Sequence, residues 1–276
     1  MPELPEVVVV SRQLNKNITG KVINDVIVYN KKLIKEIDEN SFKNKLIDKT
    51  ILKVDNFGKF IVFHLTDNVI MLSHLRMEGK YFYYDQPNFK MKHDYIIFKF
   101  NDNSFLHYND TRMFGTFHLR NKNSYKQIDP LNKLSLVPWK LQIDDFYNKL
   151  QRKNQKIKTA LLDQTLILGL GNIYADEVLF ASKISPFKKA NKITKIEAEN
   201  LLKNSTKILK ASIKLGGSSI NSYTSLNKTV GEYQNFLKVH TKANQPCVEC
   251  KNFILKTKIN GRGTYYCDVC QENNDI

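Results

Sequence analysis

The sequence has little or nothing of several features that mark other classes of protein. Its apolar runs are all shorter than the ~18 residues that a membrane-spanning helix needs, so we expect no membrane partner. The opening residues contain Glu3 and Glu6 and no basic stretch, which predicts that there is no signal peptide and that the protein is cytoplasmic. Hydrophobic residues nevertheless make up 42% of the chain, so disorder over most of its length is excluded.

Acidic residues are also scarce. The chain has 27 Asp and Glu against 43 Lys and Arg, a formal net charge of +16 at pH 7, and such a protein is attracted to polyanions such as nucleic acids. A proteome rich in lysine and asparagine would give the same excess, so charge alone leaves both explanations open. Arginine is rare, with six residues in 276. Each arginine is therefore informative, because a planar bidentate donor is not interchangeable with lysine.

Cysteine occurs only near the end of the sequence. The four residues Cys247, Cys250, Cys267 and Cys270 form two C-x2-C pairs separated by sixteen residues. Each pair can present two thiolates from one tight turn, and two such pairs provide four tetrahedral ligands for Zn²⁺. Disulfides would require an exported protein. We therefore predict one structural zinc ion without an open position for catalysis, which holds together a segment too short to build its own core.

The segment between the cysteine pairs is predicted to form a β-hairpin. Residues 253–258 and 263–266 read as strands on either side of Asn260-Gly261, a dipeptide typical of two-residue hairpin turns. Arg262 follows this turn directly. It is either a probe for a nucleic-acid groove or phosphate, or an ordinary solvated turn residue, and the sequence leaves both interpretations open.

The rest of the chain has two textures. Between about 20 and 120, short β-rich runs alternate with turns and predict an antiparallel sandwich or barrel, with strands at 22–28, 51–54, 60–65, 81–84, 95–100 and 105–108. Residues 145–215 have helical periodicity, with a capping box at Thr194-x-x-Glu197 and a helix end at Gly216-Gly217. The polar stretch 121–139 is the predicted connection between the two parts.

A glycine-rich break lies inside the helical part. Residues 168–175 read Leu-Gly-Leu-Gly-Asn-Ile-Tyr-Ala, which predicts Asn172 as the N-cap of a helix. The unpaired amides and the positive end of the helix dipole at such a start form an anion site, suited in a basic protein to a phosphate. The alternative is an ordinary pair of capped helices.

The N-terminus is a candidate for covalent chemistry. Pro2 follows Met1, and removal of Met1 would expose a secondary amine that can form an iminium ion with a sugar aldehyde. An α-amine has a pKa of ~7.7–8.0, so part of it is neutral and nucleophilic near pH 7. Glu3 is then placed to exchange protons with it. The alternative is a plain helix start over residues 2–14, where Pro and Glu are both favoured.

Six motifs occur in one order along the chain: Pro2-Glu3-Leu4-Pro5-Glu6-Val7, Gly58-Lys59-Phe60, Ser73-His74-Leu75-Arg76-Met77, Asp110-x-Arg112-x-Phe114-Gly115, Gly169-Leu170-Gly171-Asn172-Ile173-Tyr174 and the four-cysteine hairpin. With them the chain from Pro2 to Cys270 resembles the bacterial formamidopyrimidine-DNA glycosylases, which repair 8-oxoguanine. The resemblance implies a multidomain α and β fold. An N-terminal catalytic domain over 1–133 holds an antiparallel β-sandwich and the N-terminal helix, a helical domain over 134–235 holds a helix-two-turn-helix, and 236–272 form the zinc-finger hairpin.

The resemblance also implies roles for the catalytic residues. The Pro2 nitrogen attacks C1′ of the damaged nucleotide, and Glu3 is the acid and base that opens the sugar. Lys59 corresponds to the lysine of β-elimination and contacts a phosphate. Arg262 corresponds to the finger arginine that grips phosphates at the lesion and is associated with δ-elimination.

Further residues are implied as contacts to DNA. Chemistry at C1′ requires the nucleotide to leave the base stack, and Met77, Arg112 and Phe114 match the wedge that fills the resulting space. The implied backbone contacts are His74, His93, Arg152, Lys153, Lys158 and Asn172. The implied base pocket consists of Ser218, Ser219, Ile220, Asn221, Ser222 and Tyr223.

The implied function is that of a bifunctional DNA glycosylase and AP lyase. It would excise 8-oxoguanine and formamidopyrimidines from double-stranded DNA through a Schiff base on Pro2 and β,δ-elimination, as a monomer associated with the bacterial nucleoid. One alternative is an endonuclease VIII-like glycosylase for oxidised pyrimidines, although that branch usually has Gly where this chain has Leu4. The other is a non-enzymatic zinc-finger DNA-binding protein, which has no use for Pro2 and Glu3.

Overall fold

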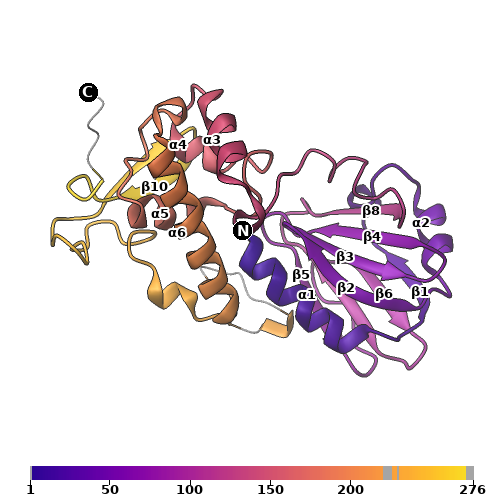
Figure 1. The fold of residues 1–276 in the computed structure, drawn as a ribbon. Coiled ribbons are helices and arrows are strands. Elements are labelled where there is room, and N and C mark those ends of the chain that lie inside the picture. The colour runs from indigo at the N-terminus through magenta and orange to yellow at the C-terminus, as the bar shows by residue number, and fades with distance from the viewer. Residues whose placement is uncertain (1, 220–225, 229, 272–276) are drawn as a thin grey trace. The chain divides into compact units, whose positions relative to one another are not determined.

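The computed structural model describes residues 2–219, 226–228 and 230–271 and divides the chain into two compact units. One unit comprises Met1–Asn132 with Gly216–Glu232, and the other comprises Lys133–Leu215 with Tyr233–Ile276 (Figure 1). This grouping differs from the predicted domains in two respects: the cysteine segment is part of the second unit, and 216–232 join the N-terminal unit. The reason for the second difference is local bonding: Leu226 N–H donates to Gln13 Oε1 at 3.1 Å, and Asn227 Oδ1 accepts from Tyr83 N–H at 2.7 Å.

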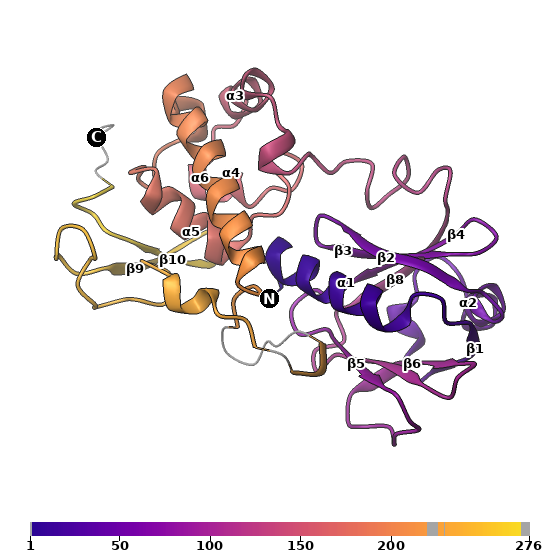
Figure 2. The same cartoon turned by 60° about the horizontal axis from the view of Figure 1, so that its bottom comes forward.

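The first unit is the predicted antiparallel sandwich. Two four-stranded sheets, ordered β1-β6-β7-β5 and β2-β3-β4-β8, form two layers that are clearly separated in Figure 2. The strands are β1 (Ile23–Val28), β2 (Ile51–Phe57), β3 (Phe60–Leu65), β4 (Val69–His74), β5 (Lys80–Tyr84), β6 (Asp94–Phe100), β7 (Phe105–Asn109) and β8 (Thr116–Asn121). All the strand pairings within the two sheets are antiparallel.

Helix α1 (Leu4–Ile18) belongs to the same core as the sheets. Its buried side chains Val7, Val10, Leu14 and Ile18 recur at helical spacing and join one hydrophobic cluster with residues of both layers. The Asn15 side chain on this helix also accepts a hydrogen bond from Val54 N–H of β2 at 2.7 Å. The first turn of α1 is therefore held at a fixed place on the sandwich. The other helix of this unit is α2 (Glu39–Leu46).

In its described residues, the second unit joins four α-helices to one hairpin. The helices are α3 (Ile143–Gln151), α4 (Ile157–Leu161), α5 (Asn172–Ala181) and α6 (Lys195–Lys214), and the hairpin strands are β9 (Leu255–Ile259) and β10 (Arg262–Tyr266). The capping box that starts α6 is confirmed, since Thr194 N–H donates to Glu197 Oε2 at 2.8 Å and Glu197 N–H donates to Thr194 Oγ1 at 3.2 Å. Short 3₁₀ turns occur at Lys31–Leu33, Pro138–Lys140, Ala190–Lys192, Leu226–Lys228 and Tyr233–Phe236. In the described ranges, no helix combines the length and the apolar character needed to cross a membrane.

Candidate functional site

Two neighbouring loops connect the two sheets of the sandwich, and they carry the predicted wedge. Residues 75–79 run from His74 to Lys80, and residues 110–115 run from Asn109 to Thr116. His74 pairs with Thr116 in one sheet, and Lys80 pairs with Asn109 in the other. Because both ends of the two loops are paired, the loops cross between the sheets side by side. The register thereby brings Met77 to the same end of the sandwich as Arg112 and Phe114.

A buried tyrosine lies beneath both crossover loops. A Cβ atom added at Gly79 would come within 2.4 Å of the Tyr108 hydroxyl, and one added at Gly115 would come within 1.7 Å of it. Any side chain at either glycine would displace Tyr108, which is itself fully buried. These two glycines are therefore required for the close approach of the loops to the core.

The second crossover loop is organised by Asp110, whose side chain is fully buried. Its carboxylate accepts the backbone N–H of Arg112 at 3.0 Å, of Phe114 at 3.0 Å and of Gly115 at 2.8 Å. These hydrogen bonds to the buried Asp110 fix the turn. The Phe114 side chain on this loop is 51% exposed to solvent. The Arg112 guanidinium carbon lies 4.8 Å from the centre of the Phe114 ring, a cation–π distance. The two predicted wedge residues thus form one exposed unit.

His74 and Lys59 lie at the same end of the sandwich as these loops. Lys59 belongs to the turn between β2 and β3, where Gly58 has a φ of 56°, and its side chain is mostly buried. Burial, followed by the positive charges of Arg76 and Lys59, lowers the pKa of His74 to about 3, so the imidazole is neutral at pH 7. Arg76 N–H donates to His74 Nδ1 at 3.0 Å. The ring hydrogen is therefore on Nε2, which makes that atom a neutral donor suited to a phosphate oxygen.

The N-terminal end of α1 is connected to the loop that begins at Gly216. Pro2 and Glu3 are buried, and Glu3 N–H donates to Glu6 Oε2 at 2.8 Å. The other oxygen of Glu6 accepts the N–H of Ser218 at 2.7 Å. Gly217, with a φ of +81°, comes so close that an added Cβ would lie 3.0 Å from Glu6 Oε1. A single carboxylate thus links the predicted nucleophile segment to the start of the predicted base pocket.

Of the six residues predicted to form the base pocket, the structure describes two, Ser218 and Ser219. Ser218 is buried, and Ser219 Oγ accepts the N–H of Gly231 at 2.8 Å. The predicted residues Ile220, Asn221, Ser222 and Tyr223 lie outside the described residues. Their contact with a base stays a prediction.

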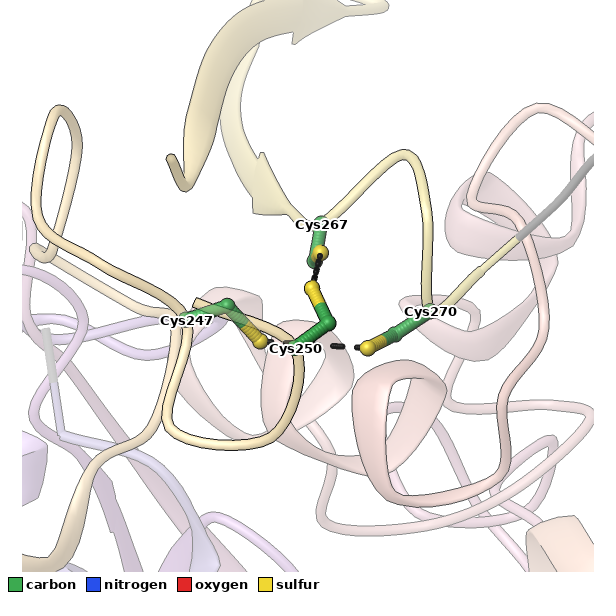
Figure 3. Close-up of side chains that lie close together, drawn as sticks. All are labelled: Cys247, Cys250, Cys267 and Cys270. Carbon is green, nitrogen blue, oxygen red and sulfur yellow. Dashed lines mark hydrogen bonds between the residues drawn. The ribbon is translucent and has the colours of Figure 1, made fainter. Parts of the chain in front are cut away.

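The four cysteines converge as predicted (Figure 3). Their sulfur atoms all lie within 4.8 Å of one another, with 3.8 Å between Cys247 and Cys270 and 3.4 Å between Cys250 and Cys267. A tetrahedral zinc ion with Zn–S bonds of ~2.3 Å requires S–S separations of ~3.8 Å, so the donor set fits Zn²⁺. All four positions of such an ion would be taken by thiolates, which leaves none for water or substrate.

The segment that carries the cysteines packs against helix α5. Phe180 of this helix packs in one small buried cluster with Val239, Ile254, Cys247 and Cys267. Glu177 accepts the backbone N–H groups of residues 238, 239 and 240 at 2.9, 3.0 and 2.8 Å. Burial raises the pKa of Glu177 even though these donors favour its charged form. The segment leading to the cysteines is therefore fixed to the helix before the zinc ligands begin.

One prediction in the second unit is wrong, and another concerns a residue that is buried. Asn172 is the first residue of α5 and Gly171 is its N-cap, so the Asn172 side chain is released from capping and donates from Nδ2 to Gly263 O at 2.8 Å. Lys158 is fully buried, and its ammonium is paired with Asp176, which also accepts from His240 Nδ1 at 2.7 Å. The ammonium is thus enclosed in this structure, and contact of Lys158 with a DNA phosphate stays a prediction.

The other predicted contacts are more accessible. Arg152 is exposed at the end of α3, and Lys153 pairs with Asp163 at 2.7 Å while both side chains stay partly exposed. His93 is partly exposed, and its carbonyl accepts the N–H of Asp110 at 3.1 Å, at the base of the second crossover loop. Sequence reasoning gave no role to Asp110, Tyr108 or Glu6. Asp110 lies within a quoted motif, but its role depends on the turn that the loop adopts.

Three family descriptions match the chain along its length. They are the formamidopyrimidine-DNA glycosylase N-terminal domain over residues 1–117, the formamidopyrimidine-DNA glycosylase H2TH domain over 137–224, and the zinc finger found in FPG and IleRS over 244–273. The first match lies within the N-terminal unit and the third within the second unit, whereas the H2TH match extends from the second unit into residues 216–224 of the first.

Known proteins resemble the chain over its whole length. It is 54% identical to the formamidopyrimidine-DNA glycosylase of Mycoplasma mobile, over 99% of this chain and 100% of that protein, and 42% identical to that of Bacillus cereus, over 98% and 99%. Among solved structures, the complex between Lactococcus lactis Fpg and abasic-site DNA matches with a TM-score of 0.93 and 38% identity, over 99% of this chain and 100% of that one. A complex of the same bacterium's Fpg with Fapy-dG DNA matches with a TM-score of 0.92 and 37% identity, over 98% and 100%.

Proposed function

Because the chain belongs to the formamidopyrimidine-DNA glycosylase family, we propose that it excises oxidised purines, namely 8-oxoguanine and formamidopyrimidines, from duplex DNA and then cleaves the strand as an AP lyase. The observation that supports this most is the link made by Glu6. It ties the Pro2–Glu3 segment to the loop that begins at Gly216, so a nucleophile and a segment suited to holding a base share one carboxylate.

In the proposed reaction, loss of Met1 exposes the Pro2 imino nitrogen. Its lone pair forms a bond to C1′, the glycosidic bond breaks, and the base leaves with the bonding electrons and takes up a proton. Glu3 then protonates O4′, so the sugar ring opens to an iminium ion on the proline. Loss of the C2′ proton expels the 3′ phosphate, and a second elimination expels the 5′ phosphate. The general acid and base need only be within hydrogen-bond reach of these atoms.

The residues around the nucleophile have separate tasks. Lys59 contacts a phosphate and assists the first elimination, and the neutral Nε2–H of His74 donates to the same backbone. Met77, Arg112 and Phe114 occupy the space left by the extruded nucleotide, with the guanidinium donating to the orphaned cytosine. The mutual stacking of Arg112 and Phe114 supports this role, because two side chains that already hold each other lose less freedom on insertion.

The second unit grips the DNA backbone. Arg152, Lys153 and the start of α5 near Asn172 are its proposed phosphate contacts, and Arg262 on the hairpin grips phosphates at the lesion. In the first unit, His93 is a further proposed phosphate contact. One zinc ion held by the four cysteines keeps that hairpin folded. The net charge of +16 suits a monomer that is attached to the nucleoid in the cytoplasm through double-stranded DNA.

Borohydride trapping tests the proposal. The protein is incubated with borohydride and a duplex carrying 8-oxoguanine opposite cytosine, one carrying an oxidised pyrimidine, or one with an abasic site. We expect a covalent protein–DNA adduct with 8-oxoguanine and with the abasic site. An adduct on oxidised pyrimidine but not on 8-oxoguanine would show that the protein is an endonuclease VIII-like glycosylase. If no adduct forms on any of the three duplexes, the protein forms no Schiff base with DNA, and the non-enzymatic DNA-binding alternative is favoured.

Replacing Asp110 with asparagine tests the wedge. An amide has one oxygen to offer the three loop N–H groups, and each buried donor left unpaired costs about 1–3 kcal/mol. We therefore expect D110N to slow excision of 8-oxoguanine about tenfold, while cleavage of a preformed abasic site changes much less. Single-turnover assays on both substrates measure the difference.

A matched control is available at the far end of the sandwich. Asp102 also caps a turn, accepting Ser104 N–H at 3.1 Å, and D102N should leave both rates unchanged. Equal slowing of the two reactions by D110N would mean that Asp110 supports the fold and not the wedge.

A further inference from the structure

The tip of the β9–β10 hairpin is attached to helix α4 by one side-chain contact. Asn260 Nδ2 donates to Thr159 Oγ1 at 3.1 Å. Asn260 and Gly261, with φ of 47° and 72°, form the turn itself, so the contact starts from the outermost point of the hairpin. Thr159 is in the middle of α4, which spans Ile157–Leu161. Both residues belong to the second unit.

Arg262 lies between this contact and a second one. The carbonyl of Gly263, the next residue, accepts from Asn172 Nδ2 at 2.8 Å, and the carbonyl of Arg262 itself accepts from Thr264 Oγ1 at 3.2 Å. The backbone is therefore attached to the helices on both sides of Arg262. The side chain is exposed, and among the described residues no oxygen accepts from its guanidinium. The backbone of Arg262 is therefore held in place, while its guanidinium is accessible to a ligand.

A solvent-open pocket of about 340 Å³ adjoins the hairpin tip, α4 and β9. It is lined by Thr159, Asn260, Arg262, Ile259, Gln155, Leu162 and Asp163. Among the described residues no atom apart from those of its chain neighbours lies within 4 Å of the position that a Cβ on Gly261 would take, so close packing does not hold the turn there and the Asn260–Thr159 hydrogen bond ties it to α4. Without that bond the turn can move relative to α4, and the Arg262 side chain moves with it.

We infer that the Asn260–Thr159 hydrogen bond is a positioning contact. It fixes the hairpin tip relative to α4 and so holds Arg262 where it can contact the phosphates at the lesion. The inference rests on the proposed phosphate-gripping role of Arg262 and adds Thr159 and Asn260 as residues that act through it. Neither residue needs to touch DNA for this purpose. The contact is set in the protein before DNA binds, so its effect is preorganisation.

The test uses variants that remove the bond and preserve the backbone. T159V replaces the hydroxyl with a methyl group, T159S keeps it, and N260G keeps the positive φ of the turn while deleting the amide. N103G is the matched control, because Asn103 has a φ of 62° in an exposed turn of the other unit. The readouts are the single-turnover rates of base excision and of the second elimination, and the affinity for an abasic-site duplex.

We expect T159V and N260G each to slow the second elimination and weaken abasic-site binding about fivefold, as loss of one modest hydrogen bond does. Base excision should stay within about twofold of the parent rate, since Pro2 is untouched. T159S and N103G should behave as the parent. The double variant T159V/N260G should be no slower than either single variant, because both remove the same bond.

Epistasis with Arg262 separates the possible failures. In an R262A background T159V should have no further effect, because the residue that the contact positions is gone. If T159V still slows the second elimination there, or has no effect in the parent protein while R262A does, the positioning contact is refuted and the role of Arg262 stands. If R262A itself leaves the second elimination and the affinity unchanged, the proposed function of Arg262 fails, and this inference fails with it.

Discussion

Replacement of Pro2 with glycine is expected to reduce excision of 8-oxoguanine on the order of 100-fold. Proline fixes its own φ and presents a secondary amine, whose iminium ion is permanently cationic. Glycine presents a primary amine on a flexible residue, and its imine must be protonated before elimination. A displacement of ~1 Å at a reacting atom is worth a rate factor of ~10². Single-turnover kinetics on an 8-oxoguanine duplex give the value.

The control for this variant is P5A, which alters a proline in the first turn of α1 without changing the terminal amine. It should excise 8-oxoguanine at nearly the parent rate. The affinity of the Pro2→Gly variant for an abasic-site duplex should also be preserved, because the phosphate contacts lie elsewhere. Retention of full excision activity by Pro2→Gly would show that another group attacks C1′.

Removal of zinc is expected to reduce binding of lesion DNA to the non-specific level, with Kd of ~10⁻⁴–10⁻⁶ M at physiological salt. The cysteine segment shares only a small buried cluster with Phe180, Val239 and Ile254. Zinc binding supplies ~10–16 kcal/mol to such sites, as much as the ~5–15 kcal/mol that stabilises a whole domain. Without it the hairpin unfolds, and Arg262 loses its place. Fluorescence anisotropy with an abasic-site duplex, alongside metal analysis, measures the loss.

The N-terminal unit should survive chelation, since its sandwich core contains none of the cysteines. Circular dichroism and a thermal transition of the chelated protein are expected to retain the β-sheet signal. C250S should reproduce the effect of chelation, and V248A, at an exposed position in the same turn, should not. Undiminished affinity after verified loss of zinc would contradict the structural role of the metal.

The parts of the fold predicted from the sequence are those with local patterns. Strand β3 was placed residue for residue, because turns bound it on both sides. Strand β4 (Val69–His74) was not among the strands named within the predicted β-rich stretch, although it lies in the interior of its sheet. Four successive residues of it are buried, so it lacks the alternation that marks a strand with one solvated face. Strand β8 was likewise not named, although all but its last residue lies in the stretch that was predicted to be β-rich.

The proposed catalytic residues could be predicted from sequence motifs, whereas the residues that hold the site in place could not. Glu6 acts on Ser218, which is 212 positions away in sequence, and no local pattern connects the two. Asn172 was expected to cap its own helix, and the placement of β10 beside α5 gives it Gly263 instead. The resemblance implied Lys158 as a DNA-backbone contact, and no local pattern showed that its ammonium pairs with the buried Asp176. Such roles arise only when distant segments pack together.

The central claim is that the N-terminal proline nitrogen becomes bonded to deoxyribose, and one measurement tests it directly. The borohydride-reduced adduct with 8-oxoguanine DNA is digested with a protease and a nuclease, and the modified peptide is sequenced by mass spectrometry. The account predicts a peptide that begins at Pro2, lacks Met1 and carries the sugar remnant on its terminal nitrogen. A remnant on Lys59 or on any other lysine, or an adduct-forming protein that still retains Met1, would contradict it.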